Sequence, residues 1–134
     1  MKNNIKQVIV IRKDLKMRRG KEIAQGCHAA MKAILDEGYY QLENEVGLPL
    51  LVVPMQPVVC EWLTGIFTKI CVSVNSEDEL LDVYQQAKES GLICSLIQDV
   101  GLTEFGGNAT YTAVAVGPAE SAAVDKITGE LKLL

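Results

Sequence analysis

Hydrophobic and polar residues follow a pattern along this chain that predicts alternating strands and helices. Residues 5–11 read IKQVIVI, a short β-branched run of the length expected for a central strand covered on both faces. From Lys21 onward, apolar and small residues recur every three or four positions, which predicts a helix to about Asp36 or somewhat beyond. The first strand is therefore followed by a helix, with a charged loop at residues 12–20 between them.

The second half of the chain repeats this alternation. Residues 68–75 read as a strand, and Ser76 opens the capping box S-E-D-E, which predicts a helix that ends at Gly91. Two further strands are expected at residues 92–98 and 112–116, joined by a polar connection that contains glycine.

The end of the chain completes the predicted fold. Residues 118–124 can form a short helix because proline is favoured in a first turn, and residues 131–134 can close the sheet as an edge strand. The order of the elements predicts an α/β fold with a mixed, mainly four-stranded sheet and helices on both faces. A length of 134 residues suits one three-layer domain over residues 1–134.

One segment does not fit the alternation. Residues 39–60 contain an apolar run interrupted by Pro49, Pro54 and Pro57, which suits neither a regular strand nor a long helix. A lid, a partner surface and a buried crossover all remain open for this segment. Its closely spaced leucines and valines favour a contact with a second copy of the chain over a lid.

Composition excludes several classes of protein. Hydrophobic residues make up 49% of the chain and charged residues 22%, so disorder is excluded as its main state. The chain starts without a long apolar segment, and its most apolar stretch is interrupted by prolines. We therefore expect a cytoplasmic protein that does not span a membrane. Four cysteines without a CxxC pair and a single histidine predict no metal site.

The net charge of -4 hides a strong asymmetry. Residues 1–21 carry eight basic side chains and one acidic side chain, whereas residues 22–134 carry five basic and sixteen acidic ones. Positive charge is thus concentrated in one short segment that can meet phosphates, with Lys16, Arg18 and Arg19 as candidate contacts. This favours localised anion recognition over wrapping of a duplex, and a solvated surface is the alternative.

Lys21, Gln25 and His28 form a polar stripe on the first predicted helix. Their spacing of four and three residues puts them within about 60° of one another around the helix axis. The stripe begins just after the carboxyl end of the first strand, where open α/β sheets usually bind ligands. It favours an anion site, and the alternatives are a solvated helix edge and a core histidine.

A second polar group follows the third predicted strand. Asp99 stands just past the end of that strand, and Thr103 lies beyond it. Thr110 and Thr112 lie at the start of the next strand. A carboxylate in this place can act as a general base or orient a water, while hydroxyls stabilise developing charge. We expect Asp99 and Lys21 to be neighbours at one edge of the sheet; an Asx turn is the alternative reading of Asp99.

Three separated motifs resemble one family. Residues 12–30 read RKDLKMRRGKEIAQGCHAA and resemble the signature of the archaeal and eukaryotic, or type 2, peptidyl-tRNA hydrolases. In that signature an R-x-D-L-x-M segment leads into G-K-x-A-A-Q-x-x-H-A. Residues 95–104 and 110–118 resemble the family's I-x-D-x-G-x-T-Q/E and T-x-T-x-L-A-I-G-P segments, and residues 125–134 resemble its C-terminal end.

The resemblance implies an ester hydrolase that needs neither a metal nor another cofactor. The family cleaves the bond between a peptide and the 3′-ribose of tRNA in peptidyl-tRNA, which recycles the tRNA. A homodimer is also implied. The residues implied to be catalytic are Lys21, Gln25, His28, Asp99, Thr103 and Thr112. The candidate substrate-binding residues are Lys16, Arg18, Arg19 and Thr110.

The chain also departs from the family pattern. Leu102 stands where the family tends to have arginine, and Ala109 replaces a glycine that is usual before Thr110. These departures leave two alternatives: an inactive member of the same fold that binds tRNA or a protein, and a small-molecule regulatory α/β module. Both alternatives are opposed by the basic segment and by the intact residues Lys21, Gln25, Asp99 and Thr103.

Overall fold

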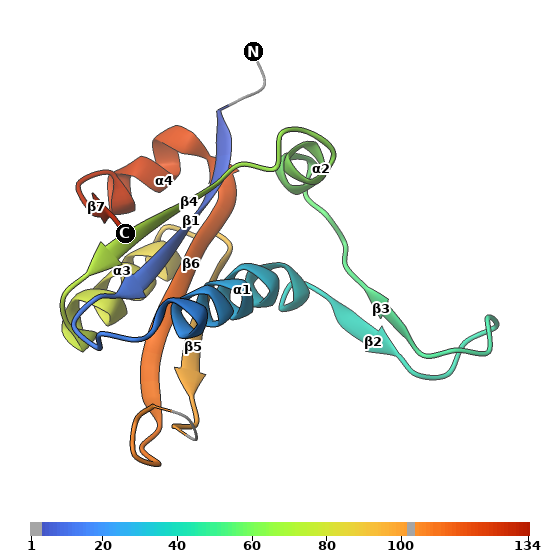
Figure 1. The fold of residues 1–134 in the computed structure, drawn as a ribbon. Coiled ribbons are helices and arrows are strands. Elements are labelled where there is room, and N and C mark those ends of the chain that lie inside the picture. The colour runs from blue at the N-terminus through green and yellow to red at the C-terminus, as the bar shows by residue number, and fades with distance from the viewer. Residues whose placement is uncertain (1–3, 102–103) are drawn as a thin grey trace.

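The computed structural model describes residues 4–101 and 104–134, and its elements alternate much as the pattern predicts (Figure 1). The strands of the main sheet are β1 (Ile5–Arg12), β4 (Lys69–Val74), β5 (Cys94–Asp99), β6 (Thr110–Glu120) and β7 (Lys132–Leu133). A small second sheet consists of β2 (Tyr39–Gln41) and β3 (Leu50–Val52). The helices are α1 (Arg19–Leu35), α2 (Pro57–Thr64), α3 (Glu77–Glu89) and α4 (Ser121–Thr128).

The main sheet is mixed and has the strand order β5-β6-β1-β4-β7. β1 runs parallel to β4 and antiparallel to β6, so it is the central strand that its sequence predicts. The expected total of four strands is too low by one. The edge strand that residues 131–134 were expected to form is present as β7, because Leu133 and Lys132 pair with Val72 and Ser73 of β4.

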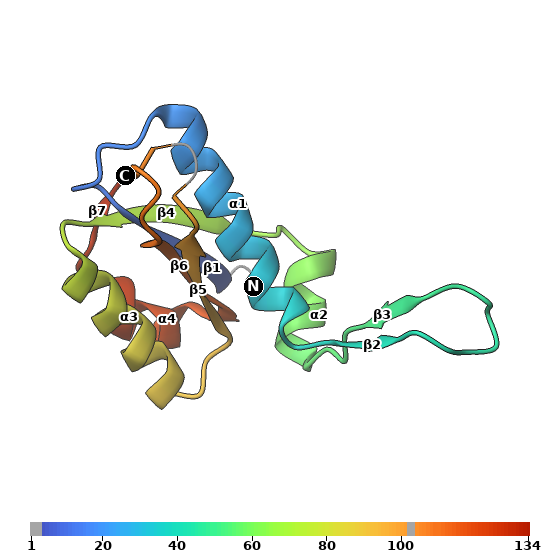
Figure 2. The same cartoon turned by 90° about the horizontal axis from the view of Figure 1, so that it is seen from below.

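Both faces of the sheet are covered, which confirms the three-layer α/β architecture. Figure 2 shows α3 and α4 on one face and α1 with α2 on the other. Alternate residues of β1 point to opposite faces: Val8 and Val10 meet α3 and α4, whereas Ile9 and Ile11 meet α1. Within the described residues, no helix has both the length and the apolar character needed to span a bilayer.

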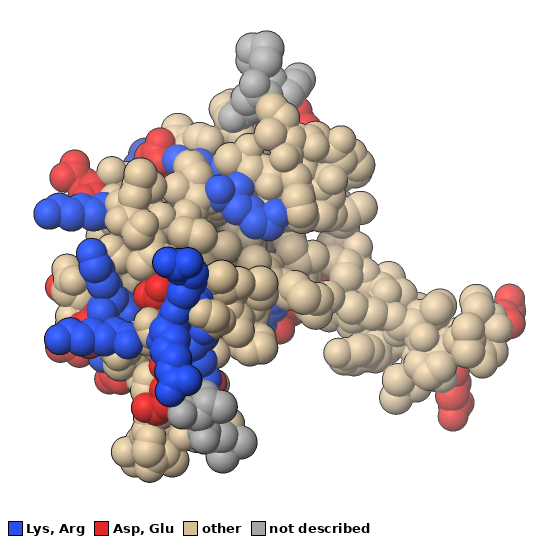
Figure 3. Space-filling model, in the orientation of Figure 1, with Lys and Arg blue, Asp and Glu red and all other residues tan. Residues whose placement is uncertain are grey.

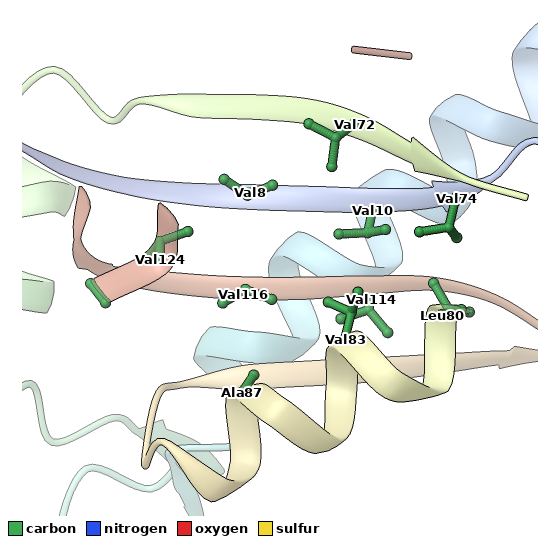
Figure 4. Close-up of a cluster of buried hydrophobic side chains, with 11 residues drawn as sticks. Val8, Val10, Val72, Val74, Leu80, Val83, Ala87, Val114, Val116 and Val124 are labelled. Carbon is green, nitrogen blue, oxygen red and sulfur yellow. The ribbon is translucent and has the colours of Figure 1, made fainter. Parts of the chain in front are cut away.

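The two cores differ in side-chain size. The α3–α4 side is built mostly from valines, among them Val114 and Val116 of β6, as Figure 4 shows. The α1 side uses alanines on both elements: Ala29 of α1 and Ala113 of β6 are fully buried. Small side chains let the backbone of α1 lie close to β5 and β6, which brings polar groups on α1 within reach of both strands.

A local signal explains where α3 begins, but another misplaces the start of the last helix. The hydroxyl of Ser76 accepts a hydrogen bond from the Glu79 backbone N–H at 3.1 Å, so the predicted cap of α3 is confirmed. The prediction that a helix begins at Pro118 is wrong. Pro118 lies inside β6, after a cis peptide bond, because β6 continues to pair with β1 as far as Glu120.

The segment at residues 39–60 forms a hairpin and the first half of α2. β2 and β3 are three residues each and extend away from the body beyond the C-terminal end of α1 (Figures 1 and 2). α2 then packs back against the body through Trp62, whose indole N–H donates to the Thr68 carbonyl at 2.9 Å. The hairpin instead exposes large apolar side chains, namely Tyr39, Tyr40, Leu42, Val46, Leu48 and Leu51.

Candidate active site

Lys21 and Asp99 meet where the start of α1 passes the end of β5. The Lys21 Nζ donates to the Asp99 Oδ1 at 2.9 Å, and each side chain is 14% exposed. This confirms the expected convergence of the two residues, which are 78 positions apart in the chain. A partly exposed ion pair of this kind is reachable by a substrate and yet shielded enough for its charges to act on one.

Asp99 accepts further hydrogen bonds around the ion pair. The Gln25 Nε2 donates to its Oδ1 at 3.4 Å, and the Gly101 backbone N–H donates to its Oδ2 at 2.9 Å. The hydrogen bond from Lys21 is the largest cause that lowers the pKa of Asp99 below its ordinary value, with Gly101 and Gln25 assisting against the effect of burial. Asp99 is therefore an ionised carboxylate at neutral pH.

The turn after Asp99 requires a glycine. Gly101 has a φ of +83°, and a Cβ atom built there would lie 2.2 Å from the Asn108 carbonyl oxygen. The same turn directs the Gly101 N–H at the carboxylate. A side chain at this position would thus disturb both the loop and a donor to Asp99.

Gln25 and Thr112 form a buried support beneath the ion pair. The Thr112 hydroxyl donates to the Gln25 Oε1, while the Gln25 amide nitrogen donates to Asp99. Gln25 is 1% exposed and Thr112 is fully buried. The two residues therefore lie beneath the site, where they orient the carboxylate, rather than on its open side.

The basic loop before α1 borders this site. Lys13, Lys16, Arg18 and Arg19 are all exposed, and Figure 3 shows Lys and Arg side chains gathered around the start of α1. Met17 is buried in the core under α1 and so anchors the middle of the loop. These charges form a patch beside Lys21 and Asp99.

Two arginines near the patch form ion pairs. Arg12 is buried and forms an ion pair with Asp14 at 2.7 Å. The hydrogen bond in this pair lowers the pKa of the Asp14 carboxyl. The Arg12 guanidinium also donates to the Tyr111 carbonyl. Its role is structural. Arg18 is largely exposed and lies 3.4 Å from Glu104, which links the loop to the connection between β5 and β6.

Three other predicted site residues, His28, Thr110 and Thr103, do not contribute a described side chain to the ion pair. His28 is exposed on α1 and faces a surface groove together with Gln98. Thr110 pairs with Asp99 across the two strands, but its hydroxyl donates to the Asn108 carbonyl. Thr103 lies outside the described residues.

Sequence reasoning missed two contributors to the site. The Phe105 ring lies 5.7 Å from the Lys21 Nζ, and Glu104 holds Arg18. Both belong to the connection after β5, whose polar composition carries no periodic signal. No group of three His, Cys, Asp or Glu side chains that could hold a metal ion occurs among the residues that the structure describes.

Comparisons with known proteins agree with one another. Residues 5–134 match the family described as "Peptidyl-tRNA hydrolase PTH2". A protein named peptidyl-tRNA hydrolase from Methanocaldococcus jannaschii is 45% identical over 130 residues, which are 97% of this chain and 100% of that protein. A protein with the same name from Methanothermobacter thermautotrophicus is 38% identical over 97% of this chain and 100% of its own length. Another, from Staphylothermus marinus, is 41% identical over 96% of this chain and 94% of its own length.

A solved structure supports the fold. It belongs to a protein of unknown function from Agrobacterium tumefaciens strain C58. The match covers 98% of this chain and 98% of that protein's chain, with a TM-score of 0.56 and 18% sequence identity. At this identity the likeness concerns the arrangement of the elements.

Proposed function

The chain belongs to the PTH2 family of peptidyl-tRNA hydrolases, and from this membership we propose that Lys21 and Asp99 form its catalytic centre. The enzyme hydrolyses the ester that joins a peptide to the 3′-ribose of tRNA. The observation that carries the proposal is the 2.9 Å contact between Lys21 and an ionised Asp99 beside the basic patch. A small-molecule regulatory module is not favoured.

Lys21 supplies positive charge to the transition state. When water adds to the ester carbonyl carbon, negative charge develops on the carbonyl oxygen. An ammonium group held in a partly shielded site stabilises that charge more than bulk water does. Asp99 fixes the direction of the Lys21 side chain, so the ammonium needs little reorganisation during the reaction.

Asp99 also orients the attacking water. A carboxylate has about four acceptor sites, and Lys21, Gln25 and Gly101 occupy three of them. The remaining site on Oδ2 can hold one water hydrogen. Because its pKa is lowered, Asp99 is a weak base that aligns the water and passes its proton on rather than retaining it.

The reaction then balances without a cofactor. The water oxygen forms a bond to the carbonyl carbon, and the bond from that carbon to the ribose O3′ breaks. One water proton ends on the O3′ of the tRNA, and the other leaves to solvent as the peptide carboxylate ionises. Thr103 is a further candidate hydroxyl donor, on the strength of the family motif alone.

The basic loop is the proposed binding surface for tRNA. Lys16, Arg18 and Arg19 are exposed beside the site, and Thr110 lies opposite Asp99 on the neighbouring strand. Phosphates bound along the loop would bring the 3′ end of the tRNA to Lys21. Because peptidyl-tRNA arises during translation, we place the enzyme in the cytoplasm, acting as one domain over residues 1–134.

We also propose a homodimer that uses the β2–β3 hairpin. A two-stranded hairpin is at best marginally stable alone in water, and this one exposes Leu42, Val46 and Leu48 to 69%, 65% and 66%. A second copy that covered these side chains would stabilise the hairpin. The hairpin leaves the C-terminal end of α1, whereas Lys21 lies at the N-terminal end, so this position favours a dimer contact over a lid (Figure 1).

Peptide release from peptidyl-tRNA in the presence of EDTA tests the proposal. The parent protein should release peptide at the same rate with and without the chelator. The Asp99→Asn protein should still bind the substrate but turn it over far more slowly. Binding without hydrolysis by the parent protein would instead identify the inactive tRNA-binding alternative.

A further inference from the structure

A surface groove of about 610 Å³ extends from the neighbourhood of the ion pair along α1. One wall belongs to α1 and includes His28, Met31 and Leu35. The other wall belongs to β5 and consists of Leu96, Ile97 and Gln98. The groove therefore separates a helix from an edge of the main sheet.

The β5 wall has unused backbone hydrogen-bonding groups. β5 is the first strand in the sheet order and pairs with β6 alone within the described part of the chain. The Ile93 carbonyl accepts from the Gly117 N–H, so it points toward β6. Backbone groups alternate in direction along an antiparallel strand, which turns those of Cys94 and Leu96 outward. An extended chain can add to such an edge.

Each wall of the groove ends at a residue that lies close in the chain to a catalytic residue. Gln98 directly precedes Asp99 on β5, and His28 lies three residues, or about one helical turn, beyond Gln25 on α1. A ligand that extends along the groove past Gln98 would therefore approach the Asp99 carboxylate. Tyr40 of β2 lines the groove as well.

The chemistry of the groove suits a peptide better than RNA. Its exposed surface is largely apolar, and its one lysine, Lys32, is paired with Asp36 at 3.2 Å. Positive charge is gathered instead around the start of α1, where Lys13, Lys16 and Arg19 are exposed and form no ion pair with the residues that the structure describes. The two halves of a peptidyl-tRNA thus have separate surfaces on either side of the ion pair.

We propose that the groove binds the peptide part of the substrate as an extra strand along β5. The inference rests on the proposed function and adds a peptide subsite to it. With the ester at Asp99, the peptide approaches the site in the same direction as β5 and so lies parallel to it. Binding through the backbone accepts any peptide sequence, while Met31 and Leu35 contact its side chains.

Substrates of increasing peptide length test the groove. At 3.3 Å per residue the part of β5 from Leu96 to Asp99 spans about three peptide residues. The value of kcat/KM should rise about three- to tenfold for each residue that gains a backbone hydrogen bond and then level off, compared with an N-acetyl-aminoacyl-tRNA. Hydrolysis at a rate independent of length would overturn the groove and leave the proposed function intact, whereas no hydrolysis of any substrate would overturn the proposed function.

N-methylated peptides separate backbone pairing from other contacts. Alternate residues of a parallel strand direct their N–H groups at the neighbouring strand. Methylation should therefore lower kcat/KM about three- to tenfold at every second position and have little effect in between. A uniform loss or no loss along the peptide would exclude pairing with β5, and no effect of the peptide at all would favour RNA in the groove.

Two exposed residues of α1 provide a matched pair of variants. Met31 is 62% exposed and lines the groove, whereas Ile23 is 60% exposed and lies on a different surface. Met31→Ala should reduce the ratio of kcat/KM for tetrapeptidyl-tRNA over N-acetyl-aminoacyl-tRNA about threefold. Ile23→Ala should keep the parent ratio. Equal ratios in both variants would contradict the role of Met31.

Discussion

The two ends of α1 lie in opposite surroundings. At the N-terminal end, Lys21 and Gln25 are held by directional hydrogen bonds to β5 and β6. At the C-terminal end, the chain passes from Leu35 into a hairpin whose Tyr39 and Tyr40 side chains are exposed. One helix thus joins a region fixed by polar geometry to a region whose apolar surface suits a partner. We expect mutations at the first end to change catalysis and mutations in the hairpin beyond the second end to change assembly.

Replacing Asp99 should have the largest effect. Asp99→Asn removes the charge that orients Lys21 and the attacking water, so kcat should fall about 10²- to 10⁴-fold with little loss of fold. The control is Asp125→Asn, which breaks a 2.6 Å ion pair with Lys6 on the other side of the molecule. Single-turnover peptide release from peptidyl-tRNA measures both. Near-parent turnover by a folded Asp99→Asn protein would remove Asp99 from the catalytic role.

A charge on the hairpin should change assembly and leave chemistry alone. Leu48→Asp places a carboxylate in the proposed dimer contact and should weaken the dimer at least about 30-fold, as loss of a central apolar contact does. Leu133→Asp, at a position that is similarly exposed on β7, is the control. Analytical ultracentrifugation measures both dissociation constants. A parent protein that is monomeric at micromolar concentration would exclude the dimer.

Variants of Thr112 and Thr128 can separate a role in supporting the active site from the general effect of changing a buried threonine. Both threonines are buried, but Thr112 donates to Gln25 while Thr128 donates to the Val124 carbonyl of its own helix. Thr112→Val leaves the Gln25 Oε1 without its donor, which should lower the free energy of unfolding by about 1–3 kcal/mol. We also expect kcat to fall about tenfold. Thr128→Val should leave kcat unchanged, and equal effects on kcat would make Thr112 an ordinary core residue.

Removing a charge from the basic loop should change how strongly the affinity for tRNA depends on salt concentration. Lys16→Ala removes one proposed phosphate contact, so the slope of log affinity against log salt should become shallower by about 0.7 to 0.9. Lys88 is exposed at the far end of α3, and Lys88→Ala should keep the parent slope. Fluorescence titration with tRNA at several salt concentrations measures the slopes. An unchanged slope for Lys16→Ala would make Lys16 part of a solvated surface.

Lowering the pH should have the smallest effect, a loss of the stability that the Asp99 ion pair contributes. The folded-state pKa of Asp99 lies below the ordinary value of 3.8, so its ion pair stabilises the fold above that pH and loses this effect as the pH falls through 3.8 and below. The difference in unfolding free energy between the parent and Asp99→Asn should shrink over this range. Denaturant unfolding at a series of pH values measures it, and a constant difference would contradict the lowered pKa.

The polar end of α1 was predictable because its signals are local. The apolar spacing after Lys21 predicts α1, and the run at residues 5–11 predicts β1. Strands that end at one edge of a sheet bring their following residues together, which is why Lys21 and Asp99 were expected to meet. The hydrogen bond of Thr112 to Gln25 beneath them was harder to foresee, since it depends on the register of β5 and β6 around an irregularity after Ile97.

The apolar end was not predictable, for two physical reasons. β2 and β3 are three residues each, too short for an alternating pattern to emerge, and neither strand buries a side chain. Pro118 misled in a different way. Its local preference is for the start of a helix, but long-range pairing of Ala119 and Glu120 with β1 keeps the chain extended.

Trp62 gives the molecule an intrinsic fluorescent reporter. It is the only tryptophan of the chain, is 3% exposed and lies on α2, close to the Phe67 ring at 4.5 Å between centroids. Indole emission shifts to longer wavelength when water reaches the ring. Its spectrum therefore records whether α2 stays packed on the body, separately from events around Lys21, so detachment of the hairpin end could be followed in solution without a label.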